Sequence, residues 1–468
     1  MSNELVTMRK VLCVLGLLSL ASYSLPVITQ AAATPLPSQM DGLPPCSQRS
    51  AISLAVSPFF QEDGLIYFVD STLSQVHALY RSSDGGEHWE AILQPQSWYD
   101  HAAIRQFAIA PMRSPQGLIL YARAALWYTG GSTYALLRSV DSGDTWTIDQ
   151  MCDESLAYCR NWVGFYLTNQ TNVWFVPRRQ TNINFEADIQ RWDNSPWFPQ
   201  VDTVWNETGA YGLSISPDYA SDRLLYASLY PTSPTLQTAL IRSSDGGNTW
   251  QDGATEGLCP GWAADMRFSP AFAEDRTVFA LQQGAVFKSV DAGATWRHVY
   301  PPGGAACQVP QRDQAANELT VSPRYAVDQT LYALVPNHDP FETSLLVSTD
   351  GGASWREILR QPGGLDKLIV APNPPQAERH VSLDMMLPTS STNGISEQQS
   401  PLHENLVSQS STTTHSLEPL TLTLFLRRFQ VGTGHLFHYR SDDGGMTWRC
   451  LPLPALPQVY LPLLLKAH

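Results

Sequence analysis

The sequence predicts an all-β protein that folds as a single seven-bladed β-propeller of four-stranded antiparallel blades. Two repeated phrases predict it. A phrase of the form Ser-x-Asp-x-Gly-x-Thr-Trp occurs six times, each time after a β-type run such as Tyr134–Arg138. A Ser-Pro or Ala-Pro step after alternating apolar and small residues recurs at intervals of 53, 106, 53, 53 and 49 residues. Because 106 is twice 53, we expect a degenerate repeat in the gap, at Gly164–Val176 and Gln190–Trp197.

The first phrase is expected to fold a turn. Its Ser and Asp side chains can hydrogen-bond the turn's own amides, its fifth-position Gly can take a positive φ, and its Trp can cover the outer seam of the blade. The aspartates expected to have this structural role are Asp84, Asp141, Asp245, Asp291, Asp350 and Asp443.

The phrase resembles the Asp-box, or BNR repeat, of sialidases, sortilin-type receptors, xyloglucan-degrading hydrolases and photosystem II assembly factors. The resemblance implies a propeller whose Asp-box turns lie on the face opposite the binding site. It implies little about function, because the family includes glycosidases, receptors and scaffolds.

The composition is typical of an exported β-protein. Only 15% of the 468 residues are charged, and the formal net charge is −14. No basic stripe is present to neutralise phosphates, which argues against nucleic acid and anionic lipid as partners. Arg9-Lys10, the apolar Val11–Leu20 and a small-x-small site before Thr34 predict a signal peptide over residues 1–33, and hence a secreted or cell-surface protein. An uncleaved membrane anchor is the alternative.

Six cysteines remain after the signal peptide, an even number that suits an oxidising compartment. Cys46 precedes the first blade and Cys450 follows the last Asp-box, so a bond between them would close the ring. The other expected pairs are Cys152–Cys159 and Cys259–Cys307, although six cysteines allow about 15 pairings. The CxxC spacings typical of zinc sites are absent, and no metal or cofactor is expected.

The expected organisation is a lead-in at 34–51, the propeller at 52–455 and a tail at 456–468. Residues 388–418, in the last blade, are rich in Ser, Thr, Gln and Asn and are predicted to be a disordered insertion. The turn after Leu420–Gln430 favours that run as the second strand of the blade, which would put the insertion on the face opposite the binding site. The tail's apolar run, Val459–Leu465, is too short to span a bilayer.

The innermost strand of each blade is expected to end at the Ser-Pro or Ala-Pro step, and the fifth residue before each Pro should lie nearest the channel mouth. Those residues are Ser53, Gln106, Gly212, Asp265, Glu318 and Lys367. Asp265 and Glu318 could form the carboxylate pair of a glycosidase. The alternative is an ion network in which Arg267 and Lys367 neutralise them, and salt bridges of both carboxylates to these cations would contradict the catalytic interpretation.

Several aromatic residues fall in the loops that enter the inner strands and should gather at the same mouth. They are Trp98, Tyr99, Trp162, Trp205, Tyr211 and Trp262. Flat aromatic faces around a shallow polar depression suit sugar rings or extended peptides. The alternative is that these rings cap the ends of the blades as ordinary core.

The resemblance to sialidases fails at their decisive residues, because Gln48-Arg49-Ser50-Ala51 does not match their Phe/Tyr-Arg-Ile-Pro motif. The sequence therefore predicts an exported, monomeric, non-catalytic propeller that binds a glycan or a protein at its channel mouth, with Arg267 and Lys367 among the ligand-binding residues. A glycoside hydrolase acting through Asp265 and Glu318 is the alternative.

Overall fold

The structure is a computed structural model that divides into two compact units, Met1–Pro37 and Ser38–His468. The described residues all belong to the second unit. They are 40–46, 53–69, 79–93, 101–128, 131–152, 162–168, 172–180, 185–187, 189–193, 200–205, 210–229, 240–259, 265–303, 315–338, 341–372, 422–430 and 435–452.

The described strands form seven sheets, and six of these share one plan, in which four consecutive strands pair antiparallel. Blade 1 is β2 (Ser53–Val56), β3 (Ile66–Val69), β4 (Leu79–Ser82) and β5 (Glu90–Leu93), and blade 2 is β6 (His101–Ser114), β7 (Gly117–Tyr128), β8 (Gly131–Ser139) and β9 (Thr147–Cys152). Blade 3 is β15 (Ala210–Ile215), β16 (Leu225–Leu229), β17 (Leu240–Ser243) and β18 (Gln251–Asp252), and blade 4 is β19 (Asp265–Phe268), β20 (Val278–Gln282), β21 (Ala285–Ser289) and β22 (Arg297–Tyr300). Blade 5 is β23 (Glu318–Val321), β24 (Leu331–His338), β25 (Phe341–Ser348) and β26 (Arg356–Pro362), and blade 6 is β27 (Gly364–Pro372), β28 (Leu422–Gln430), β29 (His435–Ser441) and β30 (Arg449–Cys450).

The prediction of a seven-bladed propeller is wrong: the structure is an all-β propeller of six four-stranded antiparallel blades, because only six sheets follow this plan. The remaining sheet, which we call the divergent sheet, comes between blades 2 and 3 along the chain. Its strands are β10 (Trp162–Leu167), β11 (Asn172–Gln180), β12 (Phe185–Ala187), β13 (Ile189–Asp193) and β14 (Gln200–Trp205). β12 is a fifth strand that pairs with β11 beside the main path, and no Asp-box phrase joins β13 to β14. The sequence of residues 194–199, which joins these strands, does not contain the Ser-x-Asp-x-Gly phrase of the regular corners.

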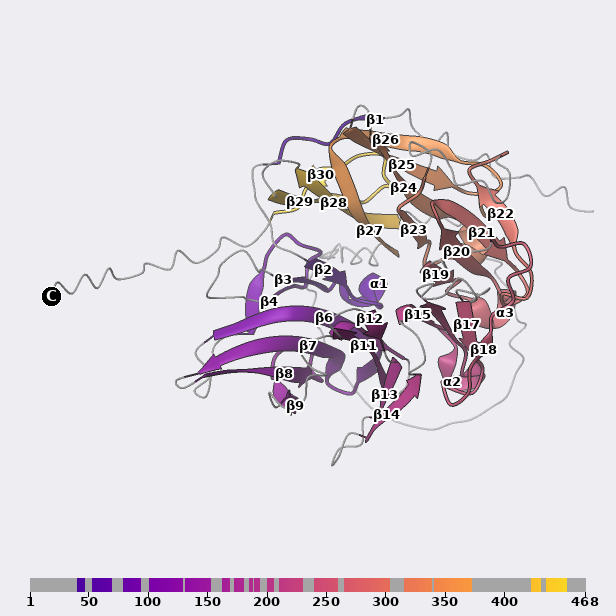
Figure 1. Ribbon diagram of the computed structural model, residues 1–468. Coiled ribbons are helices and arrows are strands. Elements are labelled where there is room, and N and C mark those ends of the chain that lie inside the picture. The colour runs from indigo at the N-terminus through magenta and orange to yellow at the C-terminus, as the bar shows by residue number, and fades with distance from the viewer. Residues whose placement is uncertain are drawn as a thin grey trace, which may run out of the picture. The chain divides into compact units, whose positions relative to one another are not determined.

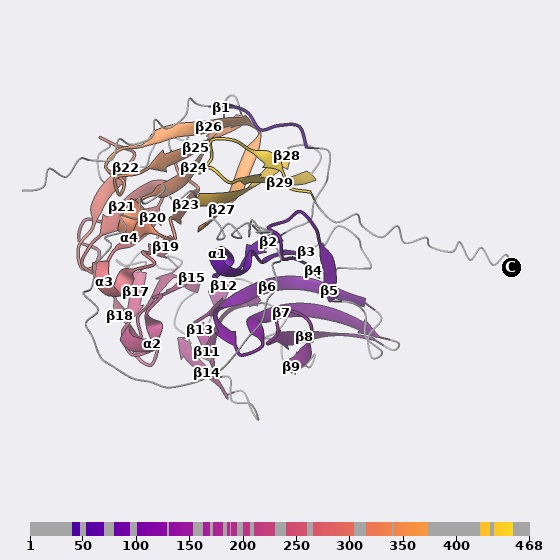
Figure 2. The same ribbon diagram turned by 180° about the vertical axis from the view of Figure 1, so that it is seen from behind.

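The first strands of the sheets lie closest to the centre of the second unit. β2 contacts β6, β6 contacts β10, β10 contacts β15, and the series continues through β19 and β23 to β27, which packs against the helix that follows β2. Figures 1 and 2 show the sheets arranged around this centre in sequence order. The first strands therefore line the channel, as the Ser-Pro spacing predicts.

Four of the Pro steps are followed by a one-turn helix that caps the inner hairpin. The helices are α1 (Phe60–Asp63), α2 (Tyr219–Asp222), α3 (Phe272–Asp275) and α4 (Tyr325–Asp328). In α4, the buried Ser322 donates to Asp328 Oδ2 at 2.7 Å, and Asp328 Oδ1 accepts from the Thr330 amide at 2.9 Å. Tyr325, the first helical residue, is fully buried. The Ala-Pro steps at Ala110 and Ala371 have no serine hydroxyl for this bond, and no helix follows them in the described residues.

All six Asp-box turns make the hydrogen bonds expected of them. In blade 4, Ser289 donates to Asp291 Oδ1 at 2.6 Å and accepts from the Gly293 amide at 2.8 Å. Asp291 Oδ2 accepts from the Thr295 hydroxyl at 2.6 Å. In blade 1, where His88 replaces Thr, His88 Nδ1 lies 2.6 Å from Asp84 Oδ2, so the imidazole keeps the contact.

Several Asp-box tryptophans join neighbouring blades at their outer edges. Trp146 of blade 2 donates to the Ile92 carbonyl of blade 1, and Trp355 of blade 5 donates to the Val299 carbonyl of blade 4. At the seam between blades 6 and 1, Trp89 donates to the Pro452 carbonyl at 2.7 Å. These tryptophans, which were predicted to cover the seams, therefore also form hydrogen bonds across them.

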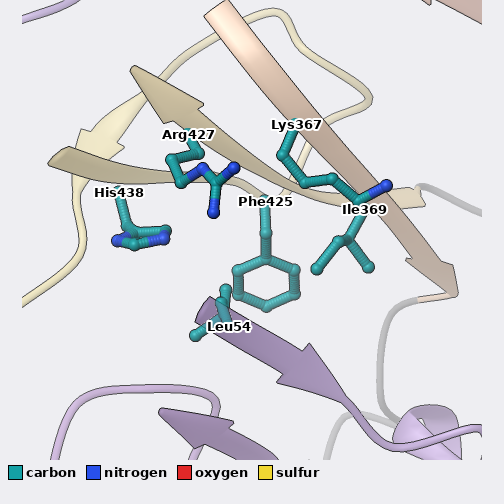
Figure 3. Close-up of a pocket in the computed structure, with 6 residues that line it drawn as sticks. All are labelled: Leu54, Lys367, Ile369, Phe425, Arg427 and His438. Atoms are coloured by element: carbon teal, nitrogen blue, oxygen red, sulfur yellow. The ribbon is translucent and has the colours of Figure 1, made fainter. Parts of the chain in front are cut away.

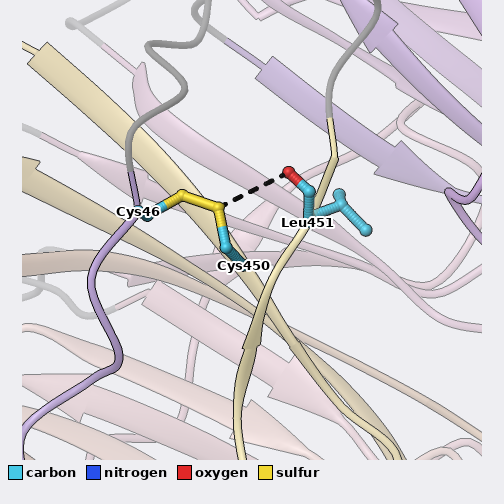
Figure 4. Close-up of a disulfide and its surroundings, with 3 residues drawn as sticks. All are labelled: Cys46, Cys450 and Leu451. Atoms are coloured by element: carbon cyan, nitrogen blue, oxygen red, sulfur yellow. Dashed lines mark hydrogen bonds between the residues drawn. A yellow bond between two sulfur atoms is a disulfide. The ribbon is translucent and has the colours of Figure 1, made fainter.

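A short N-terminal segment, residues 40–46, straps the last two blades together. Its strand β1 (Met40–Asp41) pairs in parallel with β26, and the Leu43 amide donates to Gln361 Oε1 at 2.6 Å. The structure contains the predicted disulfide between Cys46 and Cys450, whose Cα atoms are 5.5 Å apart across 404 residues of sequence. Figure 4 shows this bond beside the Leu451 carbonyl, which lies 3.9 Å from the Cys450 sulfur.

Several predictions fall wholly or partly outside the described residues. The side chains of Cys152, Cys159 and Cys307 are among these, so the other two disulfides stay predictions. The signal peptide, the lead-in at 47–51, the insertion at 388–418 and the tail at 456–468 lie outside as well. β27 and β28 pair directly and flank residues 373–421, so Leu422–Gln430 is the second strand of blade 6. In the described part of the chain, no helix is long and apolar enough to cross a membrane.

Candidate functional site at the channel mouth

The strand register separates two ends of the channel. In blade 4, Phe268 pairs with Val278, and Val278 pairs with Ser289, the first residue of the Asp-box turn. Asp265 pairs with Leu281 at the other end of the same hairpin. Glu318 and Lys367 occupy corresponding places in blades 5 and 6. The predicted residues therefore lie at the end away from the Asp-box turns, which we call the mouth.

Both candidate catalytic carboxylates at the mouth are held by cations. Asp265 forms a two-point contact with Arg267 of the same strand, with nitrogen–oxygen distances of 2.6 and 2.5 Å. Glu318 of blade 5 lies 2.6 Å from Lys367 Nζ of blade 6. The arrangement is the ion network of the alternative interpretation, and it meets the condition that contradicts a free carboxylate pair.

A third ion pair stands beside the second one. Arg427 of β28 contacts Asp366 of β27 through Nε and one terminal nitrogen, each at 2.9 Å. Such a bidentate contact fixes the guanidinium plane as well as its charge. In these three pairs each positive charge is matched by a negative one, so the described ion pairs bring hydrogen-bonding groups to the mouth without adding net charge.

Polar side chains also link one inner strand to the next, which the sequence analysis missed. Ser214 donates to the Met266 carbonyl at 3.1 Å, and Thr320 donates to the Leu368 carbonyl at 3.3 Å. Arg267 makes the same link to the Leu319 carbonyl at 3.3 Å. All three residues are the third before the Pro of their strand, so the polar character of this repeat position was the available signal. In blades 1, 2 and 6 the position holds Ala55, Ala108 and Ile369, which have no hydroxyl or guanidinium to make such a link.

A cavity lies at the seam between blades 6 and 1, where Ile369 stands. Its volume is about 80 Å³, and it is lined by Leu54, Lys367, Ile369, Phe425, Arg427 and His438 (Figure 3). Leu54 comes from β2 of blade 1, and the other residues come from three strands of blade 6. We call this space the seam cavity.

His438 of β29 lines the seam cavity two strands away from the channel-lining β27, and 2% of its surface is exposed. Burial, together with the positive charge of Arg427, lowers the pKa of the imidazole to about 3. Its ring meets the Phe68 ring edge-on, with centroids 6.0 Å apart. The imidazole is therefore neutral at physiological pH.

The side chains of the predicted aromatic residues all lie outside the described part of the structure. Trp98, Tyr99 and Trp262 lie outside the described residues. Trp162, Trp205 and Tyr211 belong to β10, β14 and β15, but their side chains are also outside the description. Their role at the mouth stays a prediction. Among the described residues, no group of three or more His, Cys, Asp or Glu side chains could hold a metal ion.

Comparison with known proteins gives distant similarities. No family profile matches the sequence. A xyloglucanase from a Paenibacillus species is 28% identical over 198 residues, which cover 37% of this chain and 19% of that enzyme. Xyloglucanase Xgh74A of Acetivibrio thermocellus is 28% identical over 207 residues, covering 38% of this chain and 24% of that enzyme. The aligned regions span about a fifth to a quarter of the length of these relatives.

Among solved structures, a chain from a structural and mechanistic study of two prolyl endopeptidases superposes with a TM-score of 0.50. The match covers 87% of this chain and 50% of that chain, at 12% sequence identity. At this identity the likeness concerns the fold alone. It carries nothing about a shared activity.

Proposed function

We propose that this protein is an exported member of the Asp-box superfamily that binds a glycan at its channel mouth without cleaving it. The observation that carries the proposal is the pairing of every candidate carboxylate at the mouth with a cation. A retaining or inverting glycosidase needs one carboxyl group as acid and another as nucleophile or base. Carboxylates neutralised by Arg and Lys are poorly suited to either role.

Two further observations support a glycan as the ligand. The sequence is similar to xyloglucanases, enzymes named for a neutral polysaccharide, over more than a third of the chain. The ion pairs also leave the mouth rich in hydrogen-bonding groups without a strong net charge, which suits the hydroxyl groups of a neutral sugar. The disulfide between Cys46 and Cys450 is consistent with an exported location.

The xyloglucanase similarity also favours a second candidate, a glycoside hydrolase acting through Asp265 and Glu318. This candidate requires that both ion pairs open and that the carboxyl groups lie roughly 5–9.5 Å apart in the complex. Turnover of a glycoside that Asp265→Asn eliminates would favour it over the binding function.

The binding function is tested by affinity electrophoresis in gels that contain xyloglucan or other glycans. Trp98→Ala and Trp262→Ala, the predicted mouth aromatics, should lose retardation while their melting temperatures stay close to that of the unchanged protein. The matched control is Trp146→Phe at an Asp-box turn, which should lose stability and keep retardation, because its indole joins two blades far from the mouth.

Other outcomes are equally informative. Unfolding of both mouth variants would show that these residues are core, as the alternative holds. Retention on a protein partner, with no retardation in any glycan gel, would replace the glycan by a protein ligand.

A further inference from the structure

The described part of the chain exposes two phenylalanine rings at the mouth end of blades 5 and 6. Phe341, the first residue of β25, is 42% exposed, and Phe429 of β28 is 36% exposed. The opposite ends of these strands lead to the Asp-box turns, since β25 ends at Ser348 and Leu424 of β28 pairs with Ser441. Both rings therefore lie at the mouth end, where the core of the blades does not cover them.

Gly364 keeps the space between these two side chains open. It is the first residue of β27 and pairs with Phe429, and the Phe341 carbonyl accepts a hydrogen bond from the neighbouring Gly363 amide at 2.9 Å. A Cβ atom at Gly364 would lie 3.6 Å from Phe341 Cζ and 3.8 Å from Phe429 Cβ. Both phenylalanines therefore border the place where a side chain of residue 364 would stand. We call Phe341, Gly364 and Phe429 the rim platform.

Charged groups that are paired with one another border the rim platform. Arg427 precedes Phe429 by two residues on β28, so the alternation of the strand directs both side chains to the same face. Asp366, which contacts Arg427 through both carboxylate oxygens, lies where β27 shifts its register with β28 between Leu365 and Lys367. Such bulges turn a side chain out of the regular alternation and are frequent beside binding sites. The platform thus has a polar edge with hydrogen-bond donors and acceptors.

The size and the charge of this surface favour a sugar over a protein partner. A stable protein interface buries about 800 Å² on each partner and has few charged residues at its centre. A whole phenylalanine side chain supplies only about 150–250 Å², and here an ion pair stands beside the two rings. A sugar ring needs less, namely a flat apolar surface for its C–H groups and a few polar groups around its edge.

The ion pair also distinguishes neutral from acidic sugars. Asp366 is exposed and already holds Arg427, so a ligand carboxylate beside them would compete with Asp366 and be repelled by it. A hydroxyl group can donate to the carboxylate or accept from the guanidinium without separating the pair. The polar edge therefore suits a neutral sugar.

We propose that the rim platform is a surface subsite on which a neutral sugar unit stacks its C–H face against Phe341 and Phe429, with its hydroxyl groups toward Asp366 and Arg427. The inference rests on the proposed function and names the place and the class of sugar that it requires. It assigns the stacking role to two aromatic residues of blades 5 and 6 that the sequence analysis did not include among the mouth aromatics.

The test is isothermal titration with a xyloglucan heptasaccharide and, in parallel, an oligogalacturonate of similar length. Phe341→Ala and Phe429→Ala should each weaken heptasaccharide binding about fivefold or more, because a stacking surface is lost. Phe429→Tyr keeps an aromatic ring and should bind as the unchanged protein does. The matched control is Val327→Ala, which removes a 77% exposed apolar side chain from α4 at the Asp-box end and should leave the affinity unchanged.

A second pair of variants tests the rim platform without removing either ring, which covers the case in which a truncated phenylalanine impairs folding. Gly364 does not have a positive φ, and a Cβ there meets both phenylalanines at ordinary van der Waals distances, so Gly364→Ala and Gly364→Val should both fold. The methyl groups of the valine should fill the space between the rings and weaken heptasaccharide binding. The alanine variant is the matched control and should weaken it less.

The outcomes separate the subsite from the proposed function. Undiminished heptasaccharide binding in both truncated variants and in Gly364→Val would overturn the subsite and leave the proposed function standing. Tighter binding of the oligogalacturonate would overturn the neutral class of sugar. Absence of binding to every glycan would overturn the proposed function itself.

Discussion

Single aspartates hold the corners of the blades through their hydrogen bonds. The bonds from Ser289 and Thr295 to Asp291 lower the pKa of its carboxyl group to about 2. In the other five turns, burial raises the pKa of the aspartate. The same pattern of hydrogen bonds has the larger effect, so the pKa of each of these carboxyl groups is also lowered. Each turn is therefore most stable with its aspartate ionised.

This shift predicts a pH dependence for Asp291. The folded pKa lies below the unfolded value of about 3.9, so the stabilisation is complete above about pH 4 and is lost as the pH falls toward 2. Asp291→Asn should lower the free energy of unfolding at pH 7 and flatten its decline between pH 4 and pH 2. The measurement is urea unfolding across that range, with the exposed Glu274→Gln as control. An equal pH slope in Asp291→Asn and the unchanged protein would contradict the account.

Among the secondary-structure elements, the inner hairpins were the most predictable. The Ser-Pro step at Ser322 marks the end of β23, and the aspartate six residues later completes a local hydrogen bond. Such features can be found in sequence because all their partners lie within a few residues. The fifth strand of the divergent sheet and the pairing of β1 with β26 were not predicted, since both depend on partners that no repeated phrase marks.

The site was predictable in position but not in detail. Alternation along the inner strand placed Asp265, Glu318 and Lys367 at one end of the channel, and the register agrees. The seam cavity was not predicted, because its lining comes from three strands of blade 6 and one strand of blade 1. Leu54 and His438, for example, are 384 residues apart in the sequence. Contacts of that kind follow from the closure of the ring and leave no local pattern.

The whole ring depends on how its first and last blades are joined. The Cys46–Cys450 bond encloses 404 residues, and hydrogen bonds from Trp89 to Pro452 and from Arg440 to Gly85 cross the same seam. Arg440 contacts the backbone of the blade 1 turn, so the two blades are tied by side chains as well as by the covalent bond. The disulfide and these side-chain contacts therefore stabilise the same boundary between blades 6 and 1.

Loss of the disulfide should therefore destabilise the protein. The loop-entropy account assigns a stabilisation of roughly 5–6 kcal/mol to a disulfide that closes so large a loop. The noncovalent contacts at the seam do not depend on the disulfide. Cys450→Ser and Cys46→Ser should lower the melting temperature by the same amount, and the double variant should fall no further, because one bond is removed in each case. Non-reducing peptide mapping and calorimetry check this. An unchanged melting temperature would show that packing alone closes the ring.

The central claim is that the mouth binds a glycan and does not cleave it. The most direct measurement incubates the purified protein with xyloglucan and follows its retention on the polymer and the release of reducing ends in the same sample. The account predicts retention with no reducing ends above the background of a heat-unfolded control. Release of reducing ends that disappears in both Asp265→Asn and Glu318→Gln would contradict it and assign the mouth to hydrolysis.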